Sequence, residues 1–457
     1  MFSIAALLLS ILPLSYAAET VLGVFIFHRH GDRTAKSTPP ANLTNLGYSE
    51  VLTSGTYYRN RYISSNAPLR LNGVSSDIVK QSQISASAPA DVVLTNSCAG
   101  FLQGFFPPVG STVGPQTLRD GTVVESPFNG FQLIPIGSVS TGANSEDTNW
   151  LQDSTNCANA KTSSNEYFYS PEYQQLLNTT QDFYNGIYPV INRTFNSTMT
   201  SYKNAYTSQY QFLPPLSLCN IPTHHTVFDL INVAEIHNAT IQSPNLITPA
   251  ALTQLRTLAD AHEYNLAWNV SSPIRAIAGM TLAAQVVDFF NTTITTNGAS
   301  KMNVQFGNYA TFTSFFGLAN LLQTNADFYG VPDYTSSMAF ELFTNYSSSS
   351  AKSFPPSHEL NVRFLFHNGT ASPSSEPSVY PLFGRNQQTV SWNDFTNEMA
   401  KFTSEIQRIG VKLAAIRRAP ARSMLMLLQQ RVRVPARARR MKMVVFPPRW
   451  VVSLALW

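Results

Sequence analysis

The stretch VLGVFIFHRHGDRTAK, from Val21 to Lys36, joins an apolar run to a cluster of charged side chains. Val21 to His28 is rich in β-branched and aromatic residues and has the length of one strand. Its near-continuous apolarity predicts a strand that is buried on both faces, as in the centre of an α/β sheet. The charged residues that follow would lie at the carboxyl end of this strand, where open α/β sheets form ligand sites.

Segments further along the chain extend the α/β pattern. Three of them have strand character: Met302 to Phe306, Ser337 to Phe343 and Asn361 to Phe366. Thr248-Pro249 and Ser272-Pro273 each predict a helix start, because a hydroxyl side chain can cap the helix and proline suits its first turn. We therefore predict an α/β domain in two parts, residues 19–143 and 271–407. A mainly helical cap, residues 144–270, would be inserted between them.

The chain begins with a predicted secretory signal peptide, residues 1–18. It holds a mostly apolar, uncharged run followed by Ser15 and Ala17, small residues of the kind that signal peptidase recognises. Asn-x-Ser/Thr acceptors then recur at Asn42, Asn178, Asn192, Asn196, Asn238, Asn269, Asn291, Asn345 and Asn368. We expect a secreted glycoprotein, extracellular or in the cell wall, in which three cysteines would leave one unpaired. No segment between the leader and the tail has the apolar length that spans a bilayer.

The C-terminal tail, residues 408–457, differs in charge from the rest of the chain. It holds twelve basic residues and no acidic one. Removing these twelve from the 30 basic residues of the chain leaves 18 against 26 acidic ones, so the body carries a net charge of −8. An acidic body does not attract nucleic acid or anionic membranes, and we predict neither as its partner.

Two accounts fit this tail. The printed residues are typical of a basic arm that binds nucleic acid or phospholipid. Alternatively, the tail comes from a shifted reading frame, since synonymous codons allow a second reading with three more cysteines, an acidic linker and an apolar run of small residues. In that case residues 408–457 carry no function, and the natural protein would reach a membrane only through a lipid anchor.

The charged cluster itself suits an anion. Arg29 and Arg33 flank His30, and two permanently charged guanidinium groups beside an imidazole suit a tetrahedral oxyanion such as phosphate. A neutral nitrogen of His30 could attack phosphorus and form a phosphohistidine. Gly31 would allow the backbone to approach a ligand. The alternative is a strand-end cluster of ion pairs with Asp32.

The motif in FHRHGDRTAK resembles the RHGxRxP signature of the histidine acid phosphatases, the secreted acid phosphatases and fungal phytases. Similar segments follow in family order: Ser97 to Pro108, Asn149 to Gln152, Ile274 to Gln285, Val331 to Phe343 and Val362 to Gly369. The resemblance covers Val21 to Phe402. It implies a phosphoglycerate-mutase-like α/β sheet flanked by helices with an inserted helical cap. It further implies that His30 is the nucleophile and that Arg29 and Arg33 bind phosphate.

The sequence departs from the family pattern at two functional positions. The His-Asp pair, whose aspartate protonates the leaving oxygen, aligns with Asn308-Tyr309, and neither residue is an acid at acidic or neutral pH. A third family arginine is expected near Ser87, yet no arginine lies between Leu71 and Leu118. Asp32 is then the candidate proton donor, unless an ion pair with Arg29 or Arg33 keeps it ionised.

Two functions follow as hypotheses. The first is a slow phosphomonoester hydrolase whose partner is a small phosphomonoester or phosphate, with no cofactor. The second is a catalytically inactive secreted or cell-wall glycoprotein that keeps the scaffold. His224-His225 resembles a metal pair, but adjacent side chains diverge and no carboxylates lie nearby, so we predict no metal site. The sequence carries no signal for an oligomeric state.

Overall fold

A computed structural model describes residues 19–113, 115–139, 157–194, 227–237, 245–346 and 354–408. These residues belong to one compact unit, Met1–Ile409. The predicted signal peptide, the tail beyond Arg408 and the pair His224-His225 lie outside the described residues.

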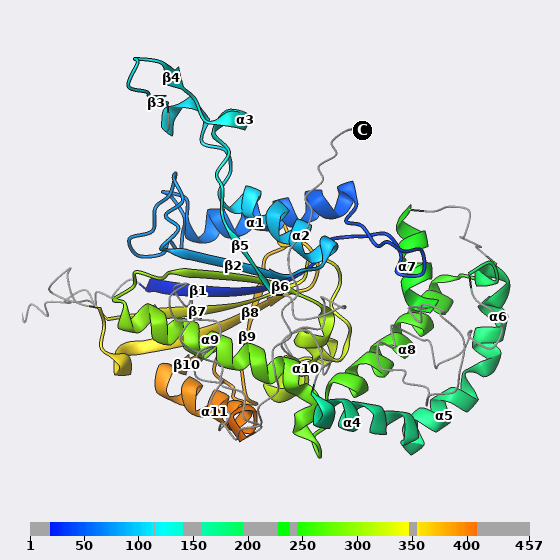
Figure 1. Cartoon of the computed structure of the whole chain (residues 1–457). Helices are drawn as coiled ribbons and strands as arrows, with labels where there is room; N and C mark the ends of the chain where they lie inside the picture. Colours follow the sequence, from blue (N-terminus) through cyan, green and yellow to red (C-terminus); the bar gives the residue numbers. More distant parts are fainter. Residues whose placement is uncertain are drawn as a thin grey trace, which may run out of the picture. The chain divides into compact units, whose positions relative to one another are not determined.

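Among the described residues, eight strands form one mixed sheet in the order β10-β8-β7-β1-β6-β2-β5, with β9 paired to β8 (Figure 1). Their bounds are β1 Thr20–Arg29, β2 Ile84–Pro89, β5 Ile136–Val139, β6 Met302–Gly307, β7 Ser337–Thr344, β8 Leu360–His367, β9 Ser378–Tyr380 and β10 Thr389–Ser391. Strand β1 is central, because it pairs in parallel with β6 and antiparallel with β7. The predicted α/β class is confirmed, and the predicted strand segments all lie within these strands.

Helices cover both faces of this sheet (Figure 1). One face carries α1 (Asn45–Tyr62) and α2 (Val92–Phe105), and the other carries α9 (Ile277–Thr295), α10 (Tyr309–Leu318) and α11 (Trp392–Arg408). Alternate side chains of a strand point to opposite faces. In β1, Val24 and Ile26 therefore join the cluster under α1 and α2, while Phe25 and Phe27 join the cluster under α9 and α10. All four are fully buried, which stabilises the sheet by about 2 kcal/mol for each side chain.

Among the described residues between the two parts of the sheet, four helices share an apolar cluster of their own: α5 Pro171–Thr179, α6 Gln181–Ile191, α7 Val227–His237 and α8 Pro249–Ala267. Helix α4 (Ala158–Glu166) precedes them in the chain. This cluster also contains Ala35 and Tyr309, which follow the ends of β1 and β6. The helical segment therefore packs directly against the carboxyl ends of the central strands. Helix α8 begins as expected, with the Thr248 side chain accepting a hydrogen bond from the Ala251 amide.

The region around Ser272-Pro273 differs from the prediction in two ways. Its first turn is a 3-10 helix, η5 (Pro273–Ala276), and α9 follows it. Together Pro273–Thr295 are long and apolar enough to cross a membrane, contrary to the expectation that no such segment exists. In this protein most of the segment is buried, and its apolar side chains pack in the core under the sheet. Length and apolarity here are those of a core helix.

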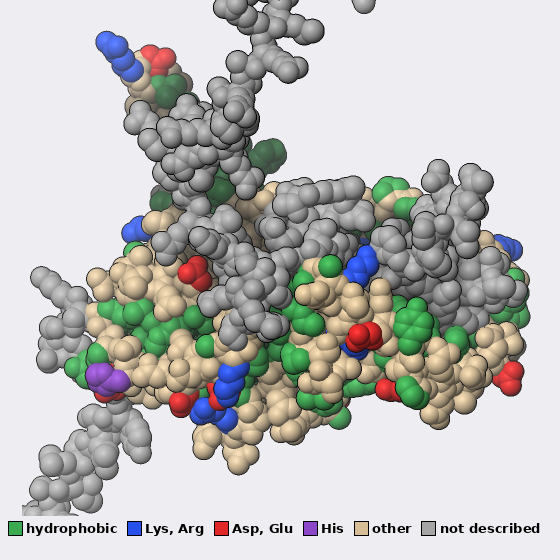
Figure 2. All heavy atoms as spheres, turned by 60° about the horizontal axis from the view of Figure 1, so that its bottom comes forward, with side chains coloured by type: hydrophobic (Ala, Val, Ile, Leu, Met, Phe, Trp, Pro, Cys, Tyr) green, Lys and Arg blue, Asp and Glu red, His purple; other side chains and the backbone are tan. Residues whose placement is uncertain are grey.

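Short elements complete the described part: α3 Pro127–Gly130, β3 Gln116–Thr117 and β4 Val123–Val124. Cys98 and Cys157 are both buried without a disulfide, and Cys219 lies outside the described residues. Figure 2 shows charged side chains scattered sparsely over one face, among uncharged polar and hydrophobic ones. This distribution agrees with a charged fraction of 12% for the whole chain.

Candidate active site

The charged motif lies where β1 ends, between the ends of β6 and β7. Arg29 is the last residue of the strand, and its amide donates to the carbonyl of Ser336. The His30 carbonyl accepts from the amide of Thr335 at 2.9 Å. Arg29, His30 and Arg33 are all buried. The backbone on either side of His30 is therefore held by the segment that leads into β7.

A backbone hydrogen bond fixes the tautomer of the His30 ring. Its Nδ1 lies 2.8 Å from the carbonyl oxygen of Gly31, so Nδ1 carries the proton and Nε2 keeps its lone pair. Burial lowers the pKa of His30 well below 6.5, and the positive charges of Arg29 and Arg33 lower it further. The low pKa favours the neutral imidazole at acidic pH.

Gly31 allows a close approach of two backbone segments. A Cβ at Gly31 would lie 2.3 Å from the carbonyl oxygen of Gly47 in α1, and a Cβ at Gly47 would lie 2.1 Å from the carbonyl oxygen of Asp32. The two backbones touch only because both residues lack a side chain. The motif loop and the first turn of α1 are therefore in direct backbone contact.

The Arg33 guanidinium is already paired. It binds the carboxylate of Asp229 in α7 through two hydrogen bonds, of 2.7 and 3.3 Å, and both side chains are buried. Burial would raise the pKa of Asp229, but Arg33 and the Lys36 amide outweigh this effect and lower it. A carboxylate therefore lies where the sequence predicted a substrate phosphate. No motif marks Asp229, which is 196 residues from Arg33.

The Tyr334 ring covers the motif. Its centroid is 5.4 Å from that of His30, 4.9 Å from the Arg29 guanidinium carbon and 5.7 Å from that of Arg33. The Arg29 guanidinium also lies 5.4 Å from the ring of Tyr309 and donates to the carbonyl of Pro332. The three predicted site residues are thus brought together, but an aromatic ring lies against all of them.

The sequence suggested that the Asp32 carboxylate pairs with Arg29 or Arg33. In the structure it contacts Thr44 and His237. Its Oδ2 accepts from the Thr44 hydroxyl and lies 2.5 Å from Nε2 of His237 at the end of α7. The side chain is fully buried. Its amide donates to Glu50 in α1 at 3.0 Å. These contacts give Asp32 a role in joining the motif loop to α1 and α7.

Asn308 and Tyr309, which the resemblance aligns with a proton-donor pair, lie at the start of α10. The Asn308 side chain caps the helix by accepting from the Ala310 amide at 2.9 Å. The Tyr309 hydroxyl donates to the buried carboxylate of Glu263 at 2.7 Å. Glu263 in turn pairs with His262 at 2.7 Å. Neither replacement presents an acid to His30, while Ser87 stands in β2 opposite Gln305 of β6.

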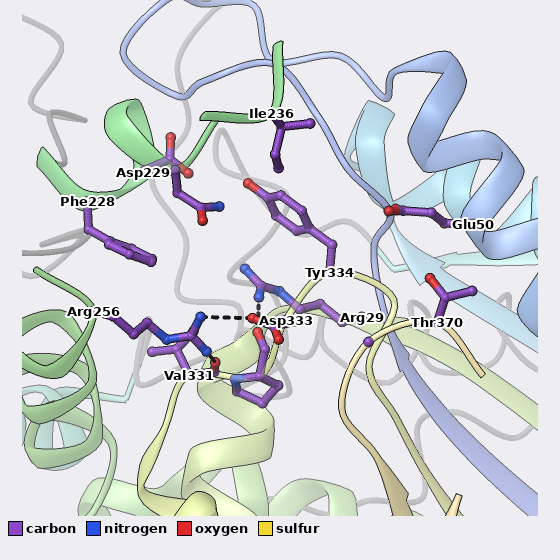
Figure 3. A pocket seen from close by; sticks show the side chains of 13 residues that line it. Arg29, Glu50, Phe228, Asp229, Ile236, Arg256, Val331, Asp333, Tyr334 and Thr370 are labelled. Atoms are coloured by element: carbon purple, nitrogen blue, oxygen red, sulfur yellow. Dashed lines mark hydrogen bonds and ion pairs between the residues drawn. The ribbon is translucent and has the colours of Figure 1, made fainter. Parts of the chain in front are cut away.

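A cavity of about 280 Å³ lies beside the motif (Figure 3). Its charged lining side chains are Arg29, Glu50, Asp229, Arg256 and Asp333. Among the described residues, the lining does not include His30 or Asp32. Figure 3 shows Tyr334 in the middle of this space, with Arg29 beneath it. Within the described part, no group of three His, Cys, Asp or Glu side chains could hold a metal ion.

His28 supports the strand end from inside the core. Its Nδ1 donates to the Arg29 carbonyl at 2.6 Å, its Nε2 lies 2.8 Å from the Ser54 hydroxyl, and its ring stacks on Phe306. Burial lowers the pKa of His28 from 6.5 to about 4, despite the hydrogen bond to Arg29. The folded protein therefore binds this proton more weakly than the unfolded chain.

This difference predicts a loss of stability in acid. As the pH falls from 6.5 to about 4, unfolded His28 becomes protonated while folded His28 does not, so the free energy of unfolding decreases. The total decrease from His28 should be about 3 kcal/mol. Urea unfolding of the wild type and of His28→Gln at pH 7 and pH 4 measures it. An equal pH dependence in both proteins would refute the assignment.

Comparison with known proteins connects this geometry to a family. Curated proteins give no match. Two solved phytases share the fold over 84% of this chain: that of Citrobacter braakii (TM-score 0.53, 15% identity, 98% of its chain) and that of Hafnia alvei (TM-score 0.51, 12% identity, 97% of its chain). The family model for the histidine phosphatase superfamily (branch 2) matches residues 37–367, beginning just after the motif. A match over this much of the sequence shows that the protein belongs to the histidine phosphatase superfamily, branch 2.

Proposed function

We propose that the protein is a secreted phosphomonoester hydrolase that acts slowly through a phosphohistidine on His30. The orientation of the His30 ring carries this proposal, because Nδ1–H is held by the Gly31 carbonyl and Nε2 keeps a lone pair. Attack of Nε2 on phosphorus forms the N–P bond and breaks the ester P–O bond. Water then attacks the phosphohistidine, which releases phosphate and restores His30.

The proposed rate is low because two parts of the family machinery are replaced. Asn308 and Tyr309 stand where the resemblance implies a proton donor, and general acid catalysis typically contributes about 10²- to 10⁴-fold. Serine stands where a third arginine is expected. Leaving groups that need no protonation, such as activated phenols, should therefore be preferred.

The lining of the cavity favours a small substrate with one phosphate. Two guanidinium groups, of Arg29 and Arg256, stand against three carboxylates, of Glu50, Asp229 and Asp333. Even when Glu50 is neutral these charges only balance, so a substrate with many phosphates would meet no excess of positive charge there. We therefore propose a monophosphate ester rather than a polyphosphate.

Exposed glycosylation acceptors support secretion. Among the described sequons, six asparagines are exposed to solvent: Asn42, Asn178, Asn192, Asn291, Asn345 and Asn368. Asn269 is half-buried. An oligosaccharide needs such exposure, so the acceptors would be usable on the folded surface. Removal of N-linked sugars from the secreted protein should reduce its apparent mass.

One observation favours the second function, a silent glycoprotein that keeps the scaffold. Asp229 neutralises Arg33, and the Tyr334 ring lies against Arg29, His30 and Arg33. A substrate phosphate would have to displace both side chains before it reached His30. Under the hydrolase proposal these two groups move when an ester binds, whereas under the silent alternative they stay.

Hydrolysis of two esters by the wild type at acidic pH distinguishes these functions. The hydrolase proposal expects measurable turnover of an activated aryl phosphate and much slower turnover of an alkyl phosphate. The silent alternative expects neither. The absence of turnover on both esters, in protein with intact glycans and a cooperative thermal transition, would reject the hydrolase.

Shortening Tyr334 provides a separate prediction. Tyr334→Ala removes a ring that contacts both guanidinium groups, and each such buried cation–π contact is worth about 1 to 2 kcal/mol. Because substrate binding no longer has to break these contacts, we expect kcat/KM for the aryl phosphate to rise about tenfold. Steady-state kinetics with Tyr334→Phe as the control, which keeps the ring, tests this. An unchanged or lower rate in Tyr334→Ala would show that the ring does not obstruct the site.

A further inference from the structure

Three carboxylates line the cavity, and two of them are bound to arginine. Asp229 is paired with Arg33 at 2.7 Å, and Asp333 is paired with Arg256 at 2.8 Å. Both carboxylates are thereby oriented as acceptors, and Arg33 lowers the pKa of Asp229. Glu50 is the third, and among the described residues it forms no ion pair with lysine or arginine. It is therefore the cavity carboxyl group that is best placed to carry a proton.

Glu50 is held close to the motif by the backbone. Its Oε2 accepts from the Asp32 amide at 3.0 Å, two residues after His30 in the sequence. The contact between Gly31 and Gly47 and the hydrogen bond from the Thr44 hydroxyl to Asp32 fix the start of α1 against the same loop. Glu50 lies within the first two turns of this helix. Figure 3 shows its carboxyl group pointing toward Tyr334 and the cavity.

The surroundings of Glu50 favour its neutral form. Burial is the largest effect and raises the pKa of Glu50 above 4.5. The Asp32 carboxylate also raises this pKa, whereas the hydrogen bond from the Asp32 amide and the nearby His237 lower it. Asp32 approaches from the motif loop, His237 from α7, and Arg29 lines the same cavity. A carboxyl group with a raised pKa can be protonated at mildly acidic pH and can donate its proton during a reaction.

We propose, on the basis of the hydrolase function above, that Glu50 donates the proton to the leaving group and so partly compensates for the missing family aspartate. As Nε2 of His30 attacks phosphorus and the ester P–O bond breaks, the leaving oxygen takes the proton of Glu50 and departs as an alcohol. The Glu50 carboxylate then removes a proton from the water that attacks the phosphohistidine. Phosphate is released, and both His30 and Glu50 return to their starting protonation states.

The replacement Glu50→Gln tests this role, because it keeps the shape and the hydrogen bond from Asp32 but removes the acidic proton. On an alkyl phosphate, which needs protonation of its leaving group, we expect kcat/KM to fall about a hundredfold. On an activated aryl phosphate the loss should stay below about threefold. Wild-type activity on the alkyl ester should decline as the pH rises through the pKa of Glu50, and this decline should be absent in Glu50→Gln.

Asp333→Asn is the matched control, since it neutralises another carboxylate of the same cavity. It should change the rates on both esters by the same factor. The proposal is overturned if Glu50→Gln loses activity equally on both esters, if it leaves the alkyl rate unchanged, or if the wild type hydrolyses only the aryl ester. A wild type that is inactive on both esters would instead reject the hydrolase function itself. Retained aryl activity in Glu50→Gln would show that the variant is folded.

Discussion

Replacing His30 by alanine should lower kcat/KM for an activated aryl phosphate by about a thousandfold or more, because it removes the atom that forms the covalent intermediate. The activated ester is the informative substrate, since its leaving group needs no proton and the loss then reports the nucleophile alone. A phosphoryl label that is stable in base and labile in acid should be trapped on the wild type and be absent from His30→Ala.

The control for this experiment is another histidine. His358, on the short 3-10 helix η8 (Ser357–Glu359), is largely exposed and distant in sequence from the motif. His358→Ala should keep the wild-type rate. Activity that survives in His30→Ala would contradict the phosphohistidine mechanism. If His30→Ala lost activity and also had a lower melting temperature, the experiment would be repeated with His30→Asn, which keeps a polar side chain of similar size.

The second large effect concerns stability and a buried carboxylate in β7. Glu341 is fully buried and accepts hydrogen bonds from Arg61, Tyr62 and Arg363. Arg363 also binds Glu19 at 2.8 Å. Glu341→Ala would remove the carboxylate that binds Arg61, while most of the Arg61 side chain would stay buried. Removing one partner of a buried ion pair typically costs about 3 to 5 kcal/mol.

Because Arg61 and Arg363 are each 16% exposed and retain some hydration, we expect the lower value, about 3 kcal/mol. Urea unfolding monitored by tryptophan fluorescence would measure this loss. Glu359→Ala, a substitution of a more exposed glutamate in η8, should change the free energy of unfolding by less than about 0.5 kcal/mol. An effect below 1 kcal/mol for Glu341→Ala would mean that water replaces the carboxylate without penalty.

Local patterns in the sequence predicted much of the fold. Val21 to His28 carried enough apolar and β-branched residues to identify the central strand, and β1 covers it. Thr248 predicted a helix start from its hydroxyl and the following proline, and α8 begins there. These features depend on residues close in sequence, whose geometry follows from local sterics and hydrogen bonding. The family resemblance rested on similar short segments.

The motif also determined where His30, Arg29 and Arg33 would meet, because all three lie within five residues at the end of one buried strand. Tertiary structure decided what surrounds them. Asp229 reaches Arg33 from a helix 196 residues away, and Tyr334 covers the motif from the loop before β7. The contact between Gly31 and Gly47 brings α1 against the motif loop, where Glu50 accepts from the Asp32 amide. Such contacts depend on how separate elements pack. Local sequence patterns do not predict these contacts, because the sequence around a charged residue does not show whether that residue will be exposed or paired in the folded protein.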